Sequence, residues 1–560
     1  ELVDVKPSGA EDPDYDVILR SRTGARFGTA VIVDKRAGIQ AAPDLACAPG
    51  GGVLLAYHTS HAHSLVKWWT IRRVKDGKIE ELAAKDPSDV KEPKGEVQGA
   101  EFPALAVMQD RLAVVTRPSQ GAYLQTVDAA GISPVRKLNR HEWGARGMRM
   151  TAAPAPDGSL LVVRRARDQS VLERITFEKA GAGFPVFRKV KDEKQVTLAE
   201  SSEAPVPDNA RVWPDTRVYF GDIHMHSAAT DGTGPPDEIY ARAWVRGHDF
   251  AALTDHDVLV GRRLFPSLQD EIAWLTDIFN AKEGFSTLHA YEWTTPALPK
   301  GSGHRNVYFR SHAPRLICGY KDRCPDTRRL NQALKKERAV AVPHHTSWTG
   351  TDWQNAEPKI QRLFEMVSVH GANEHPGEQT IKSRSRMEGM YAVDGLQTGL
   401  KFGFVGGSDA HGLLWHHGIG RKRDPWSCGL TGILAKGNSR KDLFDAMHAR
   451  RTFATSGEKL WVLLRIGEVL LGGEVKLRSP VEVHYGVFTT RPLAYFEIVR
   501  DTEVVFRAEP GGDVAGGKFK DENVPPGPHV YYLRAVQGDK AGEVDMAWTS
   551  PVFVTVLEGK

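Results

Sequence analysis

Short apolar runs recur through the middle of the chain, and each run ends in residues that can bind metal. The first run, 218–220, leads into the His-x-His pair of His224 and His226. The later runs cover 249–253, 285–291, 339–343, 364–369 and 402–405, and they end at Asp255-His256, Glu292, His344-His345, His370 and Asp409-x-His411. Runs of this length with β-prone residues are typical of buried strands. We therefore expect these polar side chains to lie where strands pass into loops.

Segments with helix signals lie between these runs. Prolines and carboxylates at 235–238 predict one helix start, and apolar residues at helical spacing predict a second helix over 266–281. Asp326 is a candidate cap for a third helix, and 439–442 begins a fourth. Alternating strands and helices with functional residues after the strands are typical of an α/β barrel. The pattern predicts a barrel over residues 213–457.

The flanks of this region have a different pattern. In residues 1–205, strand–turn–strand units at 42–56, 102–115 and 150–163 recur roughly every fifty residues, which favours a propeller-like all-β domain, built as a partial propeller or as stacked sheets. Residues 458–560 show alternating strands separated by Gly, Pro and Asp, which favours a β-sandwich of immunoglobulin-like character. A chain of 560 residues is longer than a single hydrophobic core supports, so two or three domains are expected.

The polar residues at the predicted strand ends suit divalent metal ions. Imidazole and carboxylate ligands favour zinc, manganese or iron(II), and the chain has no Cys-x-x-Cys pair for a thiolate site. A lone His-x-His pair is more often part of an exposed strand than of a metal site. Because several such motifs follow one another in order, the sequence favours a site with more than one metal.

In their order and spacing, these motifs resemble those of the PHP (polymerase and histidinol phosphatase) superfamily of metal-dependent phosphoesterases, over the middle of the chain only. Segments 303–308, 343–345 and 407–457 look similar to a large uncharacterised bacterial branch of that superfamily, which is related to the carbaryl-hydrolase-like metallohydrolases. The resemblance implies a distorted (β/α)7 PHP-type barrel, flanked by the N-terminal propeller-like domain and the C-terminal β-sandwich. It also implies two or three divalent metals per chain, with Zn, Mn or Fe as candidates.

The resemblance assigns ligands to each metal. It implies a first metal held by His224, His226, Glu292 and Asp409, a second held by the bridging Glu292 with His344 and His370, and a third held by Asp231, His256 and His411. Relatives carry either Asp or His at the position of Asp231, and His345 could exchange roles with His344. The interval from Glu292 to His344 is wider than in compact members of the superfamily, so His304 is a further candidate.

The expected chemistry follows from the metals. A hydroxide that bridges two ions would be the nucleophile, and the ions would neutralise charge on the substrate as it builds up. We expect in-line attack on the phosphorus of a small, anionic ester, without a covalent protein intermediate. Asp255 and His256 are candidates for orienting an imidazole or protonating the leaving oxygen. Arg305 is a candidate clamp for an anionic oxygen, the alternative being an exposed loop arginine.

Two other functions stay open. A metal hydroxide attacks a carbonyl carbon as readily as phosphorus, so a carboxyl-ester or carbamate hydrolase is the first alternative. A non-catalytic binding protein that keeps the ligand residues is the second. The chain has neither a Gly-x-Ser-x-Gly elbow nor a complete phosphate-binding loop, which disfavours serine nucleophiles and nucleotide-type phosphate loops.

Composition narrows the setting of the protein. The net charge of +4 comes from 74 basic and 70 acidic residues, which is too small a surplus to indicate a nucleic-acid partner. No apolar run is long enough for a membrane span. Cys318 and Cys324 flank a short polar loop and could form a disulfide in an oxidising compartment, or could stay reduced. The chain begins at Glu1, as after signal-peptide removal, so a periplasmic or secreted location is favoured over a cytoplasmic one.

Overall fold

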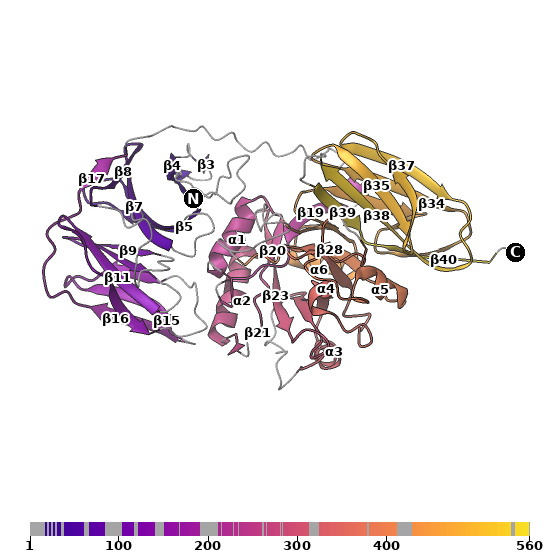
Figure 1. Ribbon diagram of the computed structural model, residues 1–560, viewed down its shortest axis with the longest axis horizontal. Coiled ribbons are helices and arrows are strands. Elements are labelled where there is room, and N and C mark those ends of the chain that lie inside the picture. The colour runs from indigo at the N-terminus through magenta and orange to yellow at the C-terminus, as the bar shows by residue number, and fades with distance from the viewer. Residues whose placement is uncertain are drawn as a thin grey trace. The chain divides into compact units, whose positions relative to one another are not determined.

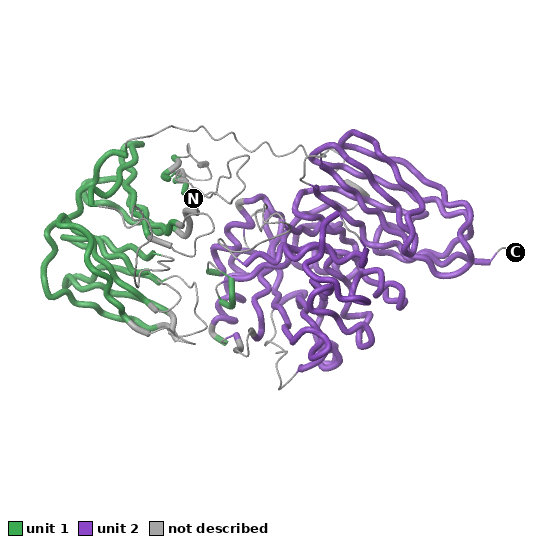
Figure 2. Tube along the Cα trace, in the orientation of Figure 1, with its two compact units in different colours: residues 1–202, 228–235, 265–267 green, residues 203–227, 236–264, 268–560 purple. Residues whose placement is uncertain are grey.

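The chain forms two compact units in the computed structural model (Figure 2). The structure describes residues 17–558 apart from 20–21, 24–25, 28–30, 35–38, 61–66, 85–102, 117–120, 141–149, 167–168, 191–210, 214–215, 228, 233–234, 260–261, 265, 281, 283, 313–323, 378–379, 412–427 and 539–543. Unit 1 comprises Glu1–Ser202, Ala228–Pro235 and Phe265–Ser267, and unit 2 comprises Glu203–Ser227, Pro236–Leu264 and Leu268–Lys560. The three predicted domains, 1–205, 213–457 and 458–560, stay a prediction.

Unit 1 consists of small antiparallel sheets (Figure 1). Its strands are β1 (Val17–Leu19), β2 (Arg22–Thr23), β3 (Arg26–Phe27), β4 (Val31–Asp34), β5 (Ile39–Cys47), β6 (Val53–Ser60), β7 (Lys67–Lys75), β8 (Lys78–Leu82), β9 (Ala104–Val107), β10 (Leu112–Thr116), β11 (Gly121–Asp128), β12 (Gly131–Ile132), β13 (Arg136–Arg140), β14 (Thr151–Pro154), β15 (Leu160–Ala166), β16 (Gln169–Ile175) and β17 (Phe187–Lys189). The predicted strand–turn–strand units are the antiparallel pairs β5–β6, β9–β10 and β14–β15. Each pair belongs to a different sheet, and the described strands form no ring of propeller blades.

One long mixed sheet organises unit 2, in the order β25-β24-β23-β20-β19-β29-β30-β39-β38-β35-β36. Its strands, with β18, β33 and β40 off this path, are β18 (Arg211–Trp213), β19 (Thr216–Asp222), β20 (Phe250–Ala252), β23 (Ser286–Thr294), β24 (His304–Phe309), β25 (Ala339–Pro343), β29 (Leu430–Ala435), β30 (Thr452–Thr455), β33 (Glu474–Leu477), β35 (Leu493–Arg500), β36 (Glu503–Ala508), β38 (Gly527–Gly538), β39 (Val544–Thr549) and β40 (Val552–Val556). The smaller sheets contain β21 (Val258–Leu259), β22 (Arg262–Arg263), β26 (Leu363–Ser368), β27 (Gly371–Ala372), β28 (Gly403–Gly406), β31 (Trp461–Ile466), β32 (Val469–Leu470), β34 (Val481–Phe488) and β37 (Val514–Asp521).

The expected (β/α)7 barrel over residues 213–457 is wrong. Strands account for 47% of the structure and helices for 12%, and no sheet among the described residues closes into a barrel. Such a barrel needs parallel strands, each followed by a helix. Here β23 is followed directly by β24, which pairs antiparallel with β23 and with β25. The β19–β29 and β29–β30 pairs are antiparallel as well.

The C-terminal strands continue the same sheet. β39 pairs with β30, so the hydrogen-bonded ladder passes from the central region into the strands after residue 457. A second sheet, β32-β31-β34-β37, packs its apolar residues into a shared core with the large sheet, as Val462, Val483, Phe496 and Leu533 illustrate. The predicted C-terminal strands therefore form, and two sheets enclose one core, but one of those sheets also belongs to the central region.

The four predicted helix starts are confirmed. They correspond to α1 (Pro236–Val245), α2 (Pro266–Asn280), α3 (Thr327–Leu334) and α6 (Arg440–His448), and the short helices α4 (Thr346–Thr349) and α5 (Ala392–Gln397) also form. Asp326 accepts a hydrogen bond from the backbone of Arg329, and Ser439 accepts one from Asp442, so both residues cap their helices. No described helix has the length and apolar character that a membrane span requires. Cys318 lies outside the described residues, so its disulfide with Cys324 stays a prediction.

Candidate metal centre

Strand ends bring the predicted ligands together. β19, β20 and β23 are parallel neighbours, so their carboxyl ends lie at one edge of the sheet. Isolated β-bridges also join Met225 to Ala410 and His256 to Glu292, which lies in the last part of β23. The backbone of Asp409 also donates to the carbonyl of His224 at 2.7 Å. Residues far apart in sequence are thereby fixed side by side.

Glu292 lies at the centre of the cluster and is 1% exposed. Its two carboxylate oxygens approach ring nitrogens of five histidines: His304 at 2.6 Å, His226 and His256 at 3.2 Å, and His224 and His344 at 3.4 Å. Such a buried carboxylate is costly unless cations or hydrogen-bond donors surround it. The arrangement therefore calls for positive charge beside Glu292.

Asp409 is the second carboxylate of the cluster. Its oxygens approach ring nitrogens of His370 at 3.2 Å, His226 at 3.3 Å, His224 at 3.4 Å and His411 at 3.6 Å. His224 and His226 thus lie between the carboxylates of Asp409 and Glu292. The two acidic side chains share the pair of imidazoles that the His-x-His motif supplies.

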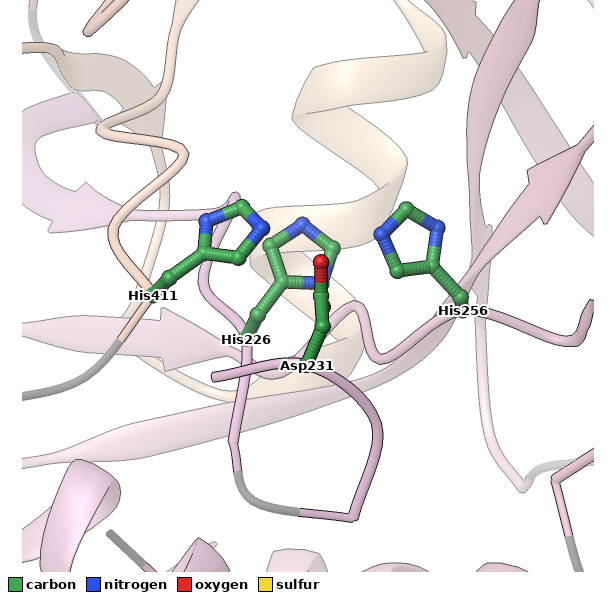
Figure 3. Close-up of side chains that lie close together, drawn as sticks. All are labelled: His226, Asp231, His256 and His411. Atoms are coloured by element: carbon green, nitrogen blue, oxygen red, sulfur yellow. The ribbon is translucent and has the colours of Figure 1, made fainter. Parts of the chain in front are cut away.

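Three groups of side chains offer donor atoms close enough together for an ion. The groups are His224, His226 and Asp409; Glu292, His304, His344 and His345; and His226, Asp231, His256 and His411. Within each group, the donor atoms all lie within 4.8 Å of one another. Figure 3 shows the last group, in which the imidazoles of His226, His256 and His411 lie beside the carboxylate of Asp231. The described residues therefore contain candidate metal-binding clusters of histidine and carboxylate.

The donor set fits divalent metals. His344 is fully buried, and neither of its ring nitrogens forms a hydrogen bond with a described residue. Buried polar atoms normally have a partner, which a bound cation would provide here. Nδ1 of His411 lies 3.0 Å from the carbonyl oxygen of Asp409, which can only accept. That bond places the imidazole proton on Nδ1, so the lone pair of neutral His411 is on Nε2.

Burial and charge act together on the ionisation of the cluster. Burial alone would raise the pKa of Glu292, yet His256, His344 and His304 hold that pKa well below its usual value. Burial would likewise raise the pKa of Asp409, but His224 and His370 have the larger effect and hold that pKa well below its usual value. Both carboxylates are therefore ionised at neutral pH.

The pKa values of the two consecutive histidines after β25 are both lowered, mainly by burial. Burial lowers the pKa of His344 to about 3, even though Glu292 works in the opposite direction. Burial, followed by the neighbouring imidazoles of His344 and His304, holds the pKa of His345 well below its usual value. Both imidazoles are therefore neutral, which is the form that can bind metal.

The backbone is strained at two of these residues. His345 has φ 34° and Asp409 has φ 55°, in the left-handed region that few residues other than glycine adopt. Gly407 approaches the site so closely that an added Cβ would lie 2.4 Å from Cβ of His224 and 2.8 Å from Oε2 of Glu365. Strain of this kind persists where the surrounding structure enforces it, often at functional sites.

The two additional histidine candidates lie in the cluster. His304, at the start of β24, contacts Glu292. His345 joins the same group as His344, so the structure brings both members of the pair to the site.

Arg305 lies on the opposite face of β24 from His304. Successive residues of a strand point to opposite sides, and His304 is on the side of Glu292. Arg305 is 1% exposed, and its guanidinium donates to the carbonyl of Ser302 and to the hydroxyl of Thr351, each at 2.9 Å. The structure therefore places Arg305 neither in the cluster nor on the exposed loop that was its alternative.

Asp255 holds a loop of the site in place. Its carboxylate accepts hydrogen bonds from the backbone of Ser227 at 2.9 Å and from the Ser227 hydroxyl at 2.6 Å. These bonds tie the turn after the His-x-His pair to the end of β20. Two residues later, the carboxylate of Asp257 accepts from the backbone of Thr294 at 2.9 Å. His256, between them, lies in the cluster.

His370 is held by an arginine that sequence reasoning did not assign to the site. Nη1 of Arg384 lies 3.2 Å from Nδ1 of His370. Arginine can only donate, so Nδ1 accepts, and the proton of the neutral imidazole is on Nε2, facing Asp409. Metal binding at Nε2 would require the other tautomer and the release of Arg384.

Sequence reasoning also missed two buried carboxylates. Oε2 of Glu365, in the middle of β26, lies 2.9 Å from Nδ1 of His224, and burial raises the pKa of Glu365 to about 7. Asp222 accepts from the backbones of His224 and Ser408, each at 3.0 Å, and so joins two ligand loops. The sequence did contain a signal for both residues, because each is an acidic residue inside an apolar run. Acidic residues are seldom buried without a partner, so this pattern indicates a paired, buried carboxylate.

A cavity elsewhere in unit 2 is not part of the cluster. It has a volume of about 670 Å³ and is lined in part by Arg310, Ala339 and His448. β25 runs from Ala339 at this cavity to Pro343, beside His344, so the length of a strand separates the cavity from the site.

The matching family and the relatives described here have no stated activity. Residues 416–485 match the family described as a protein of unknown function, DUF3604, which covers less than half of the chain. An uncharacterized protein of Chlamydia pneumoniae is 25% identical over 52% of this chain and 50% of its own length. An uncharacterized protein of Chlamydia trachomatis is 25% identical over 66% of this chain and 62% of its own length. The chain thus spans about half to three fifths of these relatives.

Two solved structures are similar to parts of the chain. One, from Bacteroides vulgatus, is described as a two-domain protein containing a predicted PHP-like metal-dependent phosphoesterase; it has 16% identity and a TM-score of 0.33, and covers 61% of this chain and 96% of its own. The other, described as a proposed metal-dependent phosphoesterase from Bifidobacterium adolescentis, has 15% identity and a TM-score of 0.22, and covers 34% of this chain and 87% of its own. At these TM-scores, the likenesses carry no inference about this chain.

Proposed function

We propose that this chain is a metal-dependent hydrolase of the PHP superfamily, and that it cleaves a small, anionic phosphoester. One observation carries the proposal: the ionised, buried carboxylates Glu292 and Asp409 lie among seven histidines drawn from separate strand ends. The cost of burying two carboxylates together is offset when cations bind between them. The relation to carbaryl-hydrolase-like enzymes stays a prediction.

The side chains of the cluster have distinct tasks in this proposal. Divalent ions, when bound, would supply an activated water and would neutralise charge on the substrate oxygens. Glu292, Asp409, His224, His226 and the neutral His344 would hold those ions. The buried donor atoms would then need little reorganisation when a substrate arrives.

Further buried groups would orient the ligands. Glu365 accepts the Nδ1 proton of His224 and so leaves Nε2 facing the two carboxylates. Asp255 fixes the turn at Ser227 beside the His-x-His pair. No protein nucleophile would be required, since the bound metals would supply the attacking water.

The proposal is tested by initial hydrolysis rates of the manganese- or zinc-loaded protein. The substrates are p-nitrophenyl phosphate, bis(p-nitrophenyl) phosphate and p-nitrophenyl acetate. We expect turnover of a phosphate ester, and we expect Asp409→Ala and His226→Ala to lose bound metal and activity together while keeping the fold. Removal of these ligands takes away charge and coordination that the metal requires.

Glu468→Ala is the matched control, because its carboxylate is 87% exposed. It should keep both metal and turnover. Full activity in Asp409→Ala would refute the site. Turnover of the acetate alone would instead favour the carboxyl-ester or carbamate hydrolase, and metal binding without any turnover would favour a binding protein.

A further inference from the structure

An exposed arginine lies over the ring of a tryptophan beside the candidate metal cluster. The guanidinium carbon of Arg384 is 3.8 Å from the centre of the Trp348 ring. Trp348 in turn contacts the imidazoles of His345 and His370, each with ring centres 4.9 Å apart. Stacking on an aromatic face restricts the guanidinium to one plane while leaving its edge open to a ligand.

Two hydrogen bonds fix Arg384 relative to the cluster. Its backbone N–H donates to the carbonyl of His370 at 2.8 Å, and its Nη1 donates to Nδ1 of the same residue at 3.2 Å. Nε2 of His370 is 3.2 Å from Asp409. A single imidazole therefore separates the guanidinium from a carboxylate of the metal cluster.

Arg384 has no acidic partner among the described residues, whereas several other arginines of unit 2 do. Arg534, for example, pairs with both Glu374 and Glu497. The guanidinium of Arg384 has five N–H groups, and only one contact, with His370, uses them. An oriented cation with spare donors in one plane suits a ligand with two anionic oxygens.

We propose that Arg384, held on Trp348, binds an anionic oxygen group of the substrate and so makes the site selective for phosphate monoesters over neutral esters. This inference rests on the proposed hydrolase function. A dianionic phosphate offers several oxygens, so metals and a guanidinium can bind it at the same time. A neutral ester gives the guanidinium no charge to bind.

A purely structural role makes a different prediction. If Arg384 only supports His370, its loss disturbs the cluster and slows every substrate alike. If Arg384 binds the substrate, its loss weakens the binding of anions and leaves neutral esters unaffected. The two roles are therefore separated by comparing charged and neutral ligands.

The test uses the metal-loaded full chain and titrates it with inorganic phosphate in a calorimeter. We expect Arg384→Gln to keep its metal content and to bind phosphate about ten- to a hundredfold more weakly, as loss of a charged hydrogen bond predicts. We also expect a KM for p-nitrophenyl phosphate raised by a similar factor, with the rate on p-nitrophenyl acetate unchanged. Arg386→Gln, at an exposed arginine two residues away, is the matched control and should bind phosphate like the wild type.

Three outcomes would overturn the inference: equal phosphate affinity in wild type and Arg384→Gln, no phosphate binding by the metal-loaded wild type, or an equal loss of rate on phosphate and acetate. Failure of the proposed function is a separate result. It would be the absence of hydrolysis of any ester by the wild type, whatever the phosphate titration gives.

Discussion

One carboxylate decides which nitrogen of His224 faces the cluster. Glu365 contacts Nδ1 of His224, so Nε2 is directed at Glu292 and Asp409. Gly407 makes this packing possible, because any side chain there would collide with both His224 and Glu365. The orientation of a candidate ligand therefore depends on residues outside the candidate ligand set.

Glu365→Gln should weaken metal binding about 10- to 100-fold without unfolding the protein, because the amide is a poorer acceptor for the Nδ1 proton of His224. A competition titration against a chelator measures the affinity. Glu388→Gln, at an exposed carboxylate, is the control and should bind metal like the wild type. Unchanged affinity in Glu365→Gln would mean that Glu365 does not orient His224.

At the scale of elements, the sequence predicts what lies in strands and helices better than how the strands pair. Caps and helical spacing located α1, α2, α3 and α6, because these signals are local. An apolar run, in contrast, does not record the direction of its neighbour. β24 and β25 could therefore be assigned as strands, but not as antiparallel partners of β23 and of each other.

The same limit applies to the site. Ligands at strand ends were predictable because the histidines and carboxylates stand directly after apolar runs. The position of Arg305 on the other face of β24 from His304 could not be predicted, because that face depends on the register with β23. Arg384 was overlooked because its contact with Trp348 joins a loop to α4, and no local pattern connects these two segments.

Glu374 connects the loop after β27 to the C-terminal strands. Its carboxylate accepts from Tyr532 and Trp548 side chains and from Arg534, each at 2.7 Å. Glu374→Ala would leave these buried donors without their acceptor and should cost about 3–5 kcal/mol of stability, measured by denaturant unfolding. Glu503→Ala, at an exposed position of β36, should cost less than about 0.5 kcal/mol. Equal costs for the two variants would contradict this account.

At the scale of the whole molecule, the unexpected feature is continuity. The hydrogen bonds between β30 and β39 join the region of the candidate metal centre to the C-terminal strands in one sheet. The change to alternating strands after residue 457 predicted a C-terminal β-sandwich, but a sequence pattern shows where strand types change and not whether a ladder continues. Stability of the cluster region is thus coupled to that of the C-terminal strands.

His248 lies beside a contact between the loop before β20 and the segment that follows β30. We expect its protonation to make the stability of this region pH-dependent. It is 7% exposed, and Lys459, which follows β30, donates to the neighbouring carbonyl of Gly247 at 2.7 Å. Burial, then Arg246 and Lys459, lowers the pKa of His248 to about 3. In the unfolded chain the pKa is about 6.5. The unfolded state therefore takes up a proton first, and stability contributed by neutral His248 is complete above about pH 6.5 and is lost as the pH falls towards 3.

His248→Gln removes this titration but keeps a polar side chain of similar length. The difference in unfolding free energy between wild type and variant should shrink by about 2 kcal/mol from pH 7 to pH 5, because one pKa unit corresponds to about 1.4 kcal/mol. Denaturant titrations of both proteins at the two pH values measure it. Every other titrating group is common to the two chains and cancels in the comparison. A difference that stays constant with pH would show that His248 is protonated equally in the folded and unfolded states.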